Sequence, residues 1–192
     1  MKKVTIIIAV IVGVIAMIGM SIAGSYNTLV SLQTTVEQRN ATVDATLQRR
    51  YDLIPNVVSS VRGYMEHESE IFTAIADARS RIGSATTPED KQKAESALES
   101  AVSRLLVLTE NYPALKADAQ VSELINQLEG TENRIFVARN DYNDAATKYN
   151  NALRRVPTNI IAGMFNFKEA KLIEVTNEAK TEVPKVDLKS KQ

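Results

Sequence analysis

VTIIIAVIVGVIAMIGMSIA, residues 4–23, is a run of twenty residues that contains no charged side chain. A helix rises about 1.5 Å per residue, so this stretch is roughly 30 Å long, the thickness of the hydrocarbon core of a bilayer. A cleaved secretory signal is the alternative, because Ser21-Ile22-Ala23 resembles a small-x-small cleavage site. The apolar region of such a signal is usually only about 7–15 residues long. The length therefore favours a retained transmembrane anchor.

The positive charges beside this run predict its direction in the membrane. Lys2 and Lys3 precede it, and the next basic residue after it is Arg39. Basic residues close to a span stay on the cytoplasmic side. We therefore expect a single pass through the inner (cytoplasmic) membrane, with the N-terminus in the cytoplasm and the remaining chain outside it. Small residues four apart, such as Ala9 and Gly13, are typical of spans that pack together. The sequence therefore also allows a homo-oligomer that forms through the anchor.

The composition after the anchor is that of one helical domain. About 170 residues remain, which is enough for a single core. Strong helix formers dominate, glycine is scarce, and no sustained alternation indicates a strand. Lys plus Arg and Asp plus Glu both number 23, and no basic stripe is present, so nucleic acid is not an expected partner. The sequence predicts an all-α fold, with an N-terminal transmembrane helix followed by an antiparallel up-down four-helix bundle.

Prolines and glycines predict where the four helical segments of the bundle begin and end. Pro55 predicts a reversal over residues 51–54, because an interior proline breaks a helix. Thr87 and Pro88 predict the N-cap and first position of the third helix, which Pro113 interrupts. The predicted helices cover residues 26–50, 55–82, 88 to about 130 with that interruption, and 131–157. The expected domain organisation is an anchor over residues 1–25, the bundle over 26–167 and a loosely structured tail over 168–192.

Several sequence motifs resemble those of the LemA family. They are LQRRYDLIPN at 47–56, ENYPALKA at 110–117, LEGTENRI at 128–135 and PTN at 157–159. The resemblance extends from Tyr26 to Phe167 and becomes loose beyond it. It implies a bacterial membrane-anchored protein with an antiparallel four-helix bundle and no assigned enzymatic activity.

The residues predict no catalytic, cofactor or metal site. His67-Glu68 matches the start of a zinc-protease motif, but Ile71 stands where the second histidine should be. Glu66, His67 and Glu70 are a candidate surface site for a divalent ion, although such clusters are usually a solvated helix face. We therefore expect a protein that is not an enzyme.

The apolar stretch that ends the expected bundle allows two interpretations. It follows Pro157, at the point where the fourth helix should return toward the bilayer. In the first interpretation it lies among lipid headgroups, and neighbouring arginines meet anionic lipid. In the second it folds over the open end of the bundle and closes its core. The candidate interface contacts are Arg154, Arg155, Ile160, Ile161, Met164, Phe165 and Phe167.

Charged residues among apolar neighbours form a second candidate site. Glu68 falls on the inner face of its predicted helix, so it needs an arginine or another hydrogen-bond donor. We predict a buried ionic network that fixes helix register, with a ligand site as the alternative. The candidate members are Glu68, Glu110, Glu132, Arg134 and Arg139.

These observations predict a non-enzymatic scaffold or adaptor of the bacterial cell envelope, with the membrane and as yet unidentified envelope proteins as partners. One alternative is an oligomeric protein that organises membrane through its anchor and the apolar stretch. A second is a metal-dependent enzyme whose site the sequence does not reveal.

Overall fold

The computed structural model describes residues 2–173, and within them every regular element is a helix. The prediction of an all-α fold with a long apolar N-terminal helix and a helical bundle is confirmed. The expected tail from residue 174 onward lies outside the described residues. The helices are α1 (Lys2–Val61), α2 (Ser69–Ser84), α3 (Pro88–Thr109), α4 (Pro113–Ala117), α5 (Ala119–Arg154) and α6 (Thr158–Met164).

Helix α1 is continuous over sixty residues and includes Pro55. The prediction of a reversal at residues 51–54 is therefore wrong. Ile54, Val57 and Val61 are buried on one face of this last part of α1, and their packing offsets the backbone hydrogen bond that the proline removes. The chain turns only after Val61, whose carbonyl accepts a hydrogen bond from the backbone N–H of Tyr64 at 3.0 Å.

Helix α5 is also longer than the sequence predicts, because it runs through Gly130 instead of starting at Thr131. A glycine inside a helix costs about 1 kcal/mol relative to alanine, and burial of the flanking Leu128 and Thr131 offsets this cost. The helix begins after Asp118, whose carboxylate accepts hydrogen bonds from the backbone N–H groups of Gln120 and Val121 at 2.9 and 3.2 Å. An aspartate N-cap of this kind fixes the observed start.

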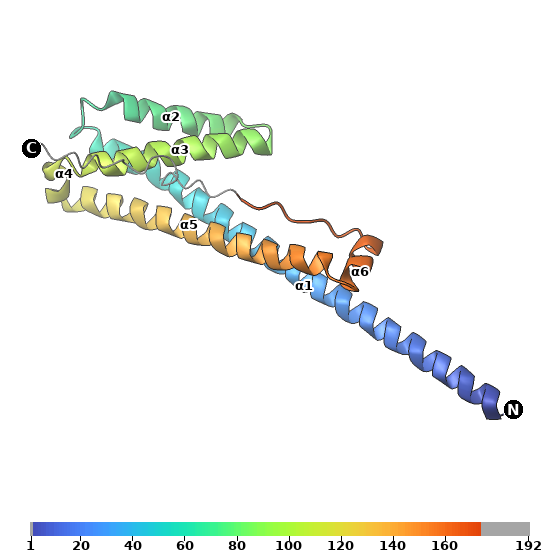
Figure 1. Ribbon diagram of the computed structural model, residues 1–192. Coiled ribbons are helices and arrows are strands. Elements are labelled where there is room, and N and C mark those ends of the chain that lie inside the picture. Colours follow the sequence, from blue (N-terminus) through green and yellow to red (C-terminus); the bar gives the residue numbers. More distant parts are fainter. Residues whose placement is uncertain (1, 174–192) are drawn as a thin grey trace, which may run out of the picture. The chain divides into compact units, whose positions relative to one another are not determined.

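The described residues divide into two compact units, each with its own core. Unit 1 contains α1 up to Arg50 together with residues 131–173, and unit 2 contains residues 51–130. In unit 2, α2 and α3 lie antiparallel and side by side (Figure 1). Thr87 is the N-cap of α3, as predicted, and accepts a hydrogen bond from the backbone N–H of Asp90.

In unit 1, the core forms between α1, α5 and α6, on faces that the seven-residue spacing predicts. Beside this core, the side-chain amides of Gln33 and Asn40 donate to the carboxylates of Glu37 and Asp44 along the surface of α1. Val156 is 78% exposed, because α5 stops at Arg154 before it. The buried residues are Leu29, Val36, Val43, Ala138, Tyr142, Ala145, Ala146, Tyr149, Leu153 and Ala162.

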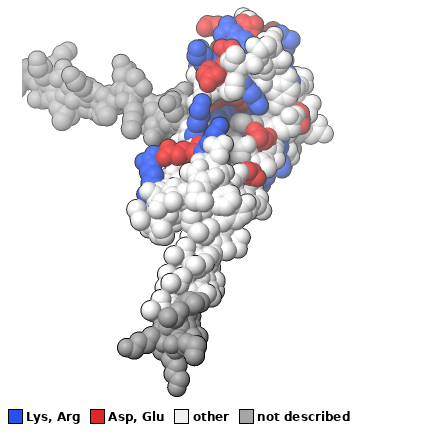
Figure 2. Space-filling view, turned by 90° about the vertical axis from the view of Figure 1, so that its right-hand side faces the viewer, with Lys and Arg blue, Asp and Glu red and all other residues white. Residues whose placement is uncertain are grey.

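The N-terminal part of α1 extends out of this core as a helix with no neighbour (Figure 1). Its described apolar side chains are not covered by the rest of the chain, with Ile7 59% and Met20 67% exposed. Among the described residues this is the one helix long and apolar enough to cross a membrane. In Figure 2 the described part of the projecting segment is white, without Lys, Arg, Asp or Glu.

Candidate functional site

The candidate site is the end of unit 1 from which α1 projects, where α6 packs beside α1. The ring of Phe165 lies 4.8 Å from the ring of Tyr26 in α1, and the ring of Phe167 lies 5.7 Å from it. Asn166 between them adopts a positive φ of 56°, which turns the chain so that both rings reach the same tyrosine. This aromatic cluster fixes α6 against α1 at the point where the apolar run ends.

Helix α6 presents one face to the core and another to solvent. Ile161 and Ala162 are buried, with 4% and 6% exposure. Ile160, Met164 and Phe165 are 61%, 68% and 51% exposed. The segment therefore closes the core with one face, as the second interpretation of the sequence predicts. It also leaves an apolar face free for the contact that the first interpretation predicts.

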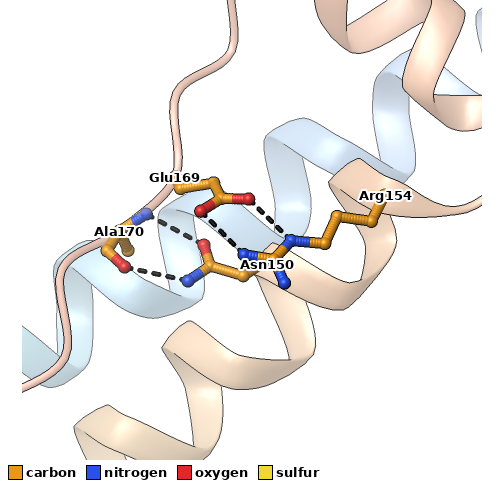
Figure 3. Close-up of polar contacts among 4 residues, drawn as sticks. All are labelled: Asn150, Arg154, Glu169 and Ala170. Atoms are coloured by element: carbon orange, nitrogen blue, oxygen red, sulfur yellow. Dashed lines mark hydrogen bonds and ion pairs between the residues drawn. The ribbon is translucent and has the colours of Figure 1, made fainter.

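The segment after α6, residues 168–173, runs along α5 in an extended conformation; we call it the strap. The side-chain amide of Asn150 donates to the carbonyl of Ala170 at 2.8 Å, and its oxygen accepts from the N–H of Ala170 at 2.9 Å (Figure 3). Asn143 makes the same pair with Ile173, at 2.8 and 2.9 Å. Of the expected tail, this part lacks helix and strand, but two asparagines hold its backbone.

An ion pair adds to the attachment of the strap. The guanidinium of Arg154 donates to both carboxylate oxygens of Glu169, from Nε at 2.7 Å and from Nη2 at 3.0 Å (Figure 3). This hydrogen bonding lowers the pKa of Glu169 below its usual range and raises the pKa of Arg154. The charge of Arg154 is thus matched by that of Glu169, although both side chains and Arg155 are exposed.

A cleft of about 580 Å³ opens beside the aromatic cluster, between α1, α5 and the strap. Tyr149 contributes to its floor, and the pKa of this phenol is raised, first by burial and second by the charge of Glu37. The lining residues are Tyr26, Val30, Gln33, Val36, Glu37, Tyr149, Phe165, Asn166, Phe167, Lys168 and Ala170.

The five residues expected in one buried ionic network are divided between the two units. In unit 2, Glu68 accepts a hydrogen bond from the hydroxyl of Tyr112 at 3.0 Å, which supplies the donor it needs. Glu110 is exposed and pairs with Lys116, because it lies on the outer side of the turn after α3. These two glutamates therefore have separate partners.

In unit 1, the other three members also differ from one another. Arg134 is exposed, on the outer face of α5, so it is not part of a buried network. Arg139 is buried, with 8% exposure, and Glu132 is half-buried. The prediction of one buried network is therefore wrong for Glu110 and Arg134.

The sequence analysis missed Arg50, a fully buried arginine with 0% exposure. Its Nη1 lies 3.4 Å from Oε2 of Glu132. The signal was present, because Leu29, Val36, Val43 and Arg50 are spaced by seven and Arg50 occupies the same face of α1. The two strap-binding asparagines were missed as well, although the pair Tyr-Asn occurs twice, at 142–143 and 149–150.

The candidate divalent-ion residues lie on the surface of unit 2. Glu66, His67 and Glu70 are all exposed, and Glu70 lies 4.0 Å from the guanidinium of Arg104. Among residues 2–173, no three His, Cys, Asp or Glu side chains are grouped as ligands for a metal ion.

The long apolar helix and the all-helical fold define a membrane-associated helical protein. A family model described as LemA family matches residues 39–188, and the chain belongs to this family. The match begins later than the Tyr26 expected from the motifs. It also continues past Phe167, where the resemblance of the motifs becomes loose, to residue 188.

Curated relatives agree with this membership. Magnetosome protein MamQ 2 of Paramagnetospirillum magneticum is 26% identical over 175 residues, covering 78% of this chain and 64% of the relative. Magnetosome protein MamQ of Magnetospirillum gryphiswaldense is 24% identical, covering 74% of this chain and 62% of the relative. Protein LemA of Metamycoplasma hominis is 21% identical, covering 87% of this chain and 77% of the relative. The chain thus spans less than two thirds of the length of these two MamQ proteins.

Proposed function

We propose that this protein is a membrane-tethered scaffold or adaptor of the bacterial cell envelope, which acts without catalysis by holding protein partners. The continuity of α1 carries the proposal. One helix contains both the apolar run and the core residues Leu29, Val36 and Val43 of unit 1. Since no loop separates the anchor from this core, unit 1 has a fixed orientation to the membrane. Such a rigid connection between anchor and core suits a protein that presents a surface to partner proteins.

The polar contacts support a role that is not catalytic. Two charged pairs on the surface of unit 1 are bonded to each other: Arg154 to Glu169 at the candidate site, and Arg39 to Asp141 further along α1. The exposed apolar residues support contact with proteins, since Phe136 and Val137 on α5 are both 50% exposed. Exposed aromatic and aliphatic side chains of this kind are typical anchors of protein interfaces.

Lys2 and Lys3 support an orientation with the N-terminus in the cytoplasm and both units outside the inner membrane. The chain contains no cysteine, so the labelling of a single introduced cysteine reports the side of the membrane on which that residue lies. A membrane-impermeant maleimide should label Gln92→Cys, which is exposed in unit 2, in intact cells. Lys3→Cys is the matched control and should be labelled only after lysis. Labelling of Gln92→Cys only after lysis contradicts the orientation.

Photo-crosslinking in native membranes tests the scaffold itself. A photoreactive residue at Phe136 or Val137 should give products with other envelope proteins, identified by mass spectrometry. The same residue at Lys148, an exposed polar position on α5, is the control and should give fewer products. Products that contain only copies of this chain contradict the proposal and support the oligomeric alternative.

A further inference from the structure

We infer that α6 lies on the membrane surface. Its outward side chains Ile160 and Met164, with Phe165 directly after the helix, enter the headgroup layer of the leaflet from which α1 emerges. The occupant of this apolar face is therefore a lipid surface. The inference goes beyond the proposed scaffold and holds whether or not the protein has protein partners.

The depth of α6 follows from its contact with α1. The twenty-residue run that matches the hydrocarbon thickness ends at Ala23. Tyr26 lies three residues further, about 4.5 Å along the helix axis. The headgroup layer of one leaflet is about 5–7 Å deep, so Tyr26 lies within it. Because the ring of Phe165 is 4.8 Å from that of Tyr26, the end of α6 lies at the same depth.

The chemistry of the exposed face fits this depth. Helix α6 (TNIIAGM) carries no charged residue. Ile160 and Met164 are four apart and share one side of the helix, opposite the buried Ala162. Figure 2 shows a predominantly uncharged surface around the point where α1 leaves unit 1. Tyrosine is enriched at this level of membrane proteins, which fits Tyr26, and phenylalanine is common on the apolar face of interfacial segments, which fits Phe165.

The arginines have a smaller role than the sequence suggests. Arg154 already donates two hydrogen bonds to Glu169, so its charge is compensated. Both arginines of the doublet are exposed, so the ion pair with Glu169, and not burial, sets Arg154 apart from Arg155. The apolar face therefore drives the contact, and neutral lipid should support it as well as anionic lipid does.

The test uses the full chain in vesicles of phosphatidylcholine, with an environment-sensitive nitrobenzoxadiazole probe on single cysteines. Ile160→Cys and Met164→Cys place the probe on the outward face of α6. Val137→Cys is the matched control, an exposed apolar position about 25 Å along α5 from Arg154. All three positions are exposed, so the substitutions leave the core intact. Lipids with a nitroxide near the glycerol end of the acyl chain serve as the quencher.

At residues 160 and 164 the emission should shift to the blue, and nitroxide lipid should remove most of it. At residue 137 the emission should stay water-like and unquenched. Water-like emission at all three positions overturns the inference. A blue shift that nitroxide lipid does not quench overturns it as well, because a protein surface then covers the face. Adding Met164→Asp to the residue-160 probe should abolish quenching while far-ultraviolet circular dichroism is unchanged.

Discussion

Replacing Asn150 by alanine should release the strap while leaving the helices folded. The side chain of Asn150 makes two hydrogen bonds to Ala170, one as donor and one as acceptor. Its replacement removes both bonds at once and leaves the core side chains in place. Opening of a peripheral segment is expected at a free energy below that of global unfolding.

The magnitude follows from the two bonds. A typical hydrogen bond contributes about 1 kcal/mol net, so their loss should destabilise the attached strap by about 2 kcal/mol. Each 1.4 kcal/mol is a factor of about ten in an equilibrium constant, which gives roughly a 30-fold increase in the open population. Amide hydrogen exchange of the full chain in detergent should show this increase at the N–H of Ala170.

Asn151→Ala is the matched control, because Asn151 is the exposed neighbour on the same helix. Asn151→Ala should leave exchange at Ala170 unchanged, and Asn150→Ala should leave exchange in the centre of α5 unchanged. Equal exchange at Ala170 in the wild type and in Asn150→Ala would refute the reasoning. Faster exchange throughout α5 would refute it differently, by showing that the strap unfolds only with the whole core.

Three further predictions follow from the same contacts. Leu29→Ala should lower the free energy of unfolding in detergent by about 2–5 kcal/mol, because Leu29 is fully buried, while Val30→Ala, at a partly exposed position, should change it by less than about 1 kcal/mol. Arg154 lowers the pKa of Glu169, so this contact stabilises the strap above the pKa of an unfolded glutamate and is lost as the pH falls through the lower folded pKa. Nuclear magnetic resonance of the strap amides should follow that loss, and Glu169→Gln should abolish the pH dependence. Pro55→Ala should raise the melting temperature and add up to about 3 kcal/mol to the free energy of unfolding, because it restores a helical hydrogen bond. A lower melting temperature would show that the proline ring itself contributes packing.

The core of unit 1 follows a simple sequence spacing, and helix periodicity therefore indicates it. Leu29, Val36 and Val43 are seven residues apart, and all three are buried. The helix ends were predicted less well, because they depend on long-range packing. Pro55 and Gly130 are local helix breakers, yet both lie inside helices whose neighbouring residues are buried. Local propensity of this size is outweighed by tertiary burial.

The polar contacts were the least predictable part of the candidate site. A sequence indicates that Glu68 needs a partner, but it does not indicate that the partner is the hydroxyl of Tyr112, 44 residues away. The exposed ends of long side chains are equally hard to place, as the separate positions of Glu110 and Arg134 show. The strap was missed for a different reason. Its backbone is held by Asn143 and Asn150, and by the hydroxyl of Tyr142, which donates to the carbonyl of Lys171 at 2.8 Å. Backbone recognition of this kind leaves no pattern in the recognised segment.

The repeated Tyr-Asn pair explains how α5 binds both a core and a strap. Seven residues of helix rise about 10.5 Å, and three extended residues span about the same length. Asn143 and Asn150 therefore match Ile173 and Ala170, while the adjacent Tyr142 and Tyr149 are buried in the core. The strap follows α6 in the chain. Helix α6 is therefore connected at its start to α5 and at its end to the strap, which is bound to α5. Together with the tilted and edge-on contacts of Phe165 and Phe167 with the ring of Tyr26, this attachment fixes the depth of α6 relative to the anchor.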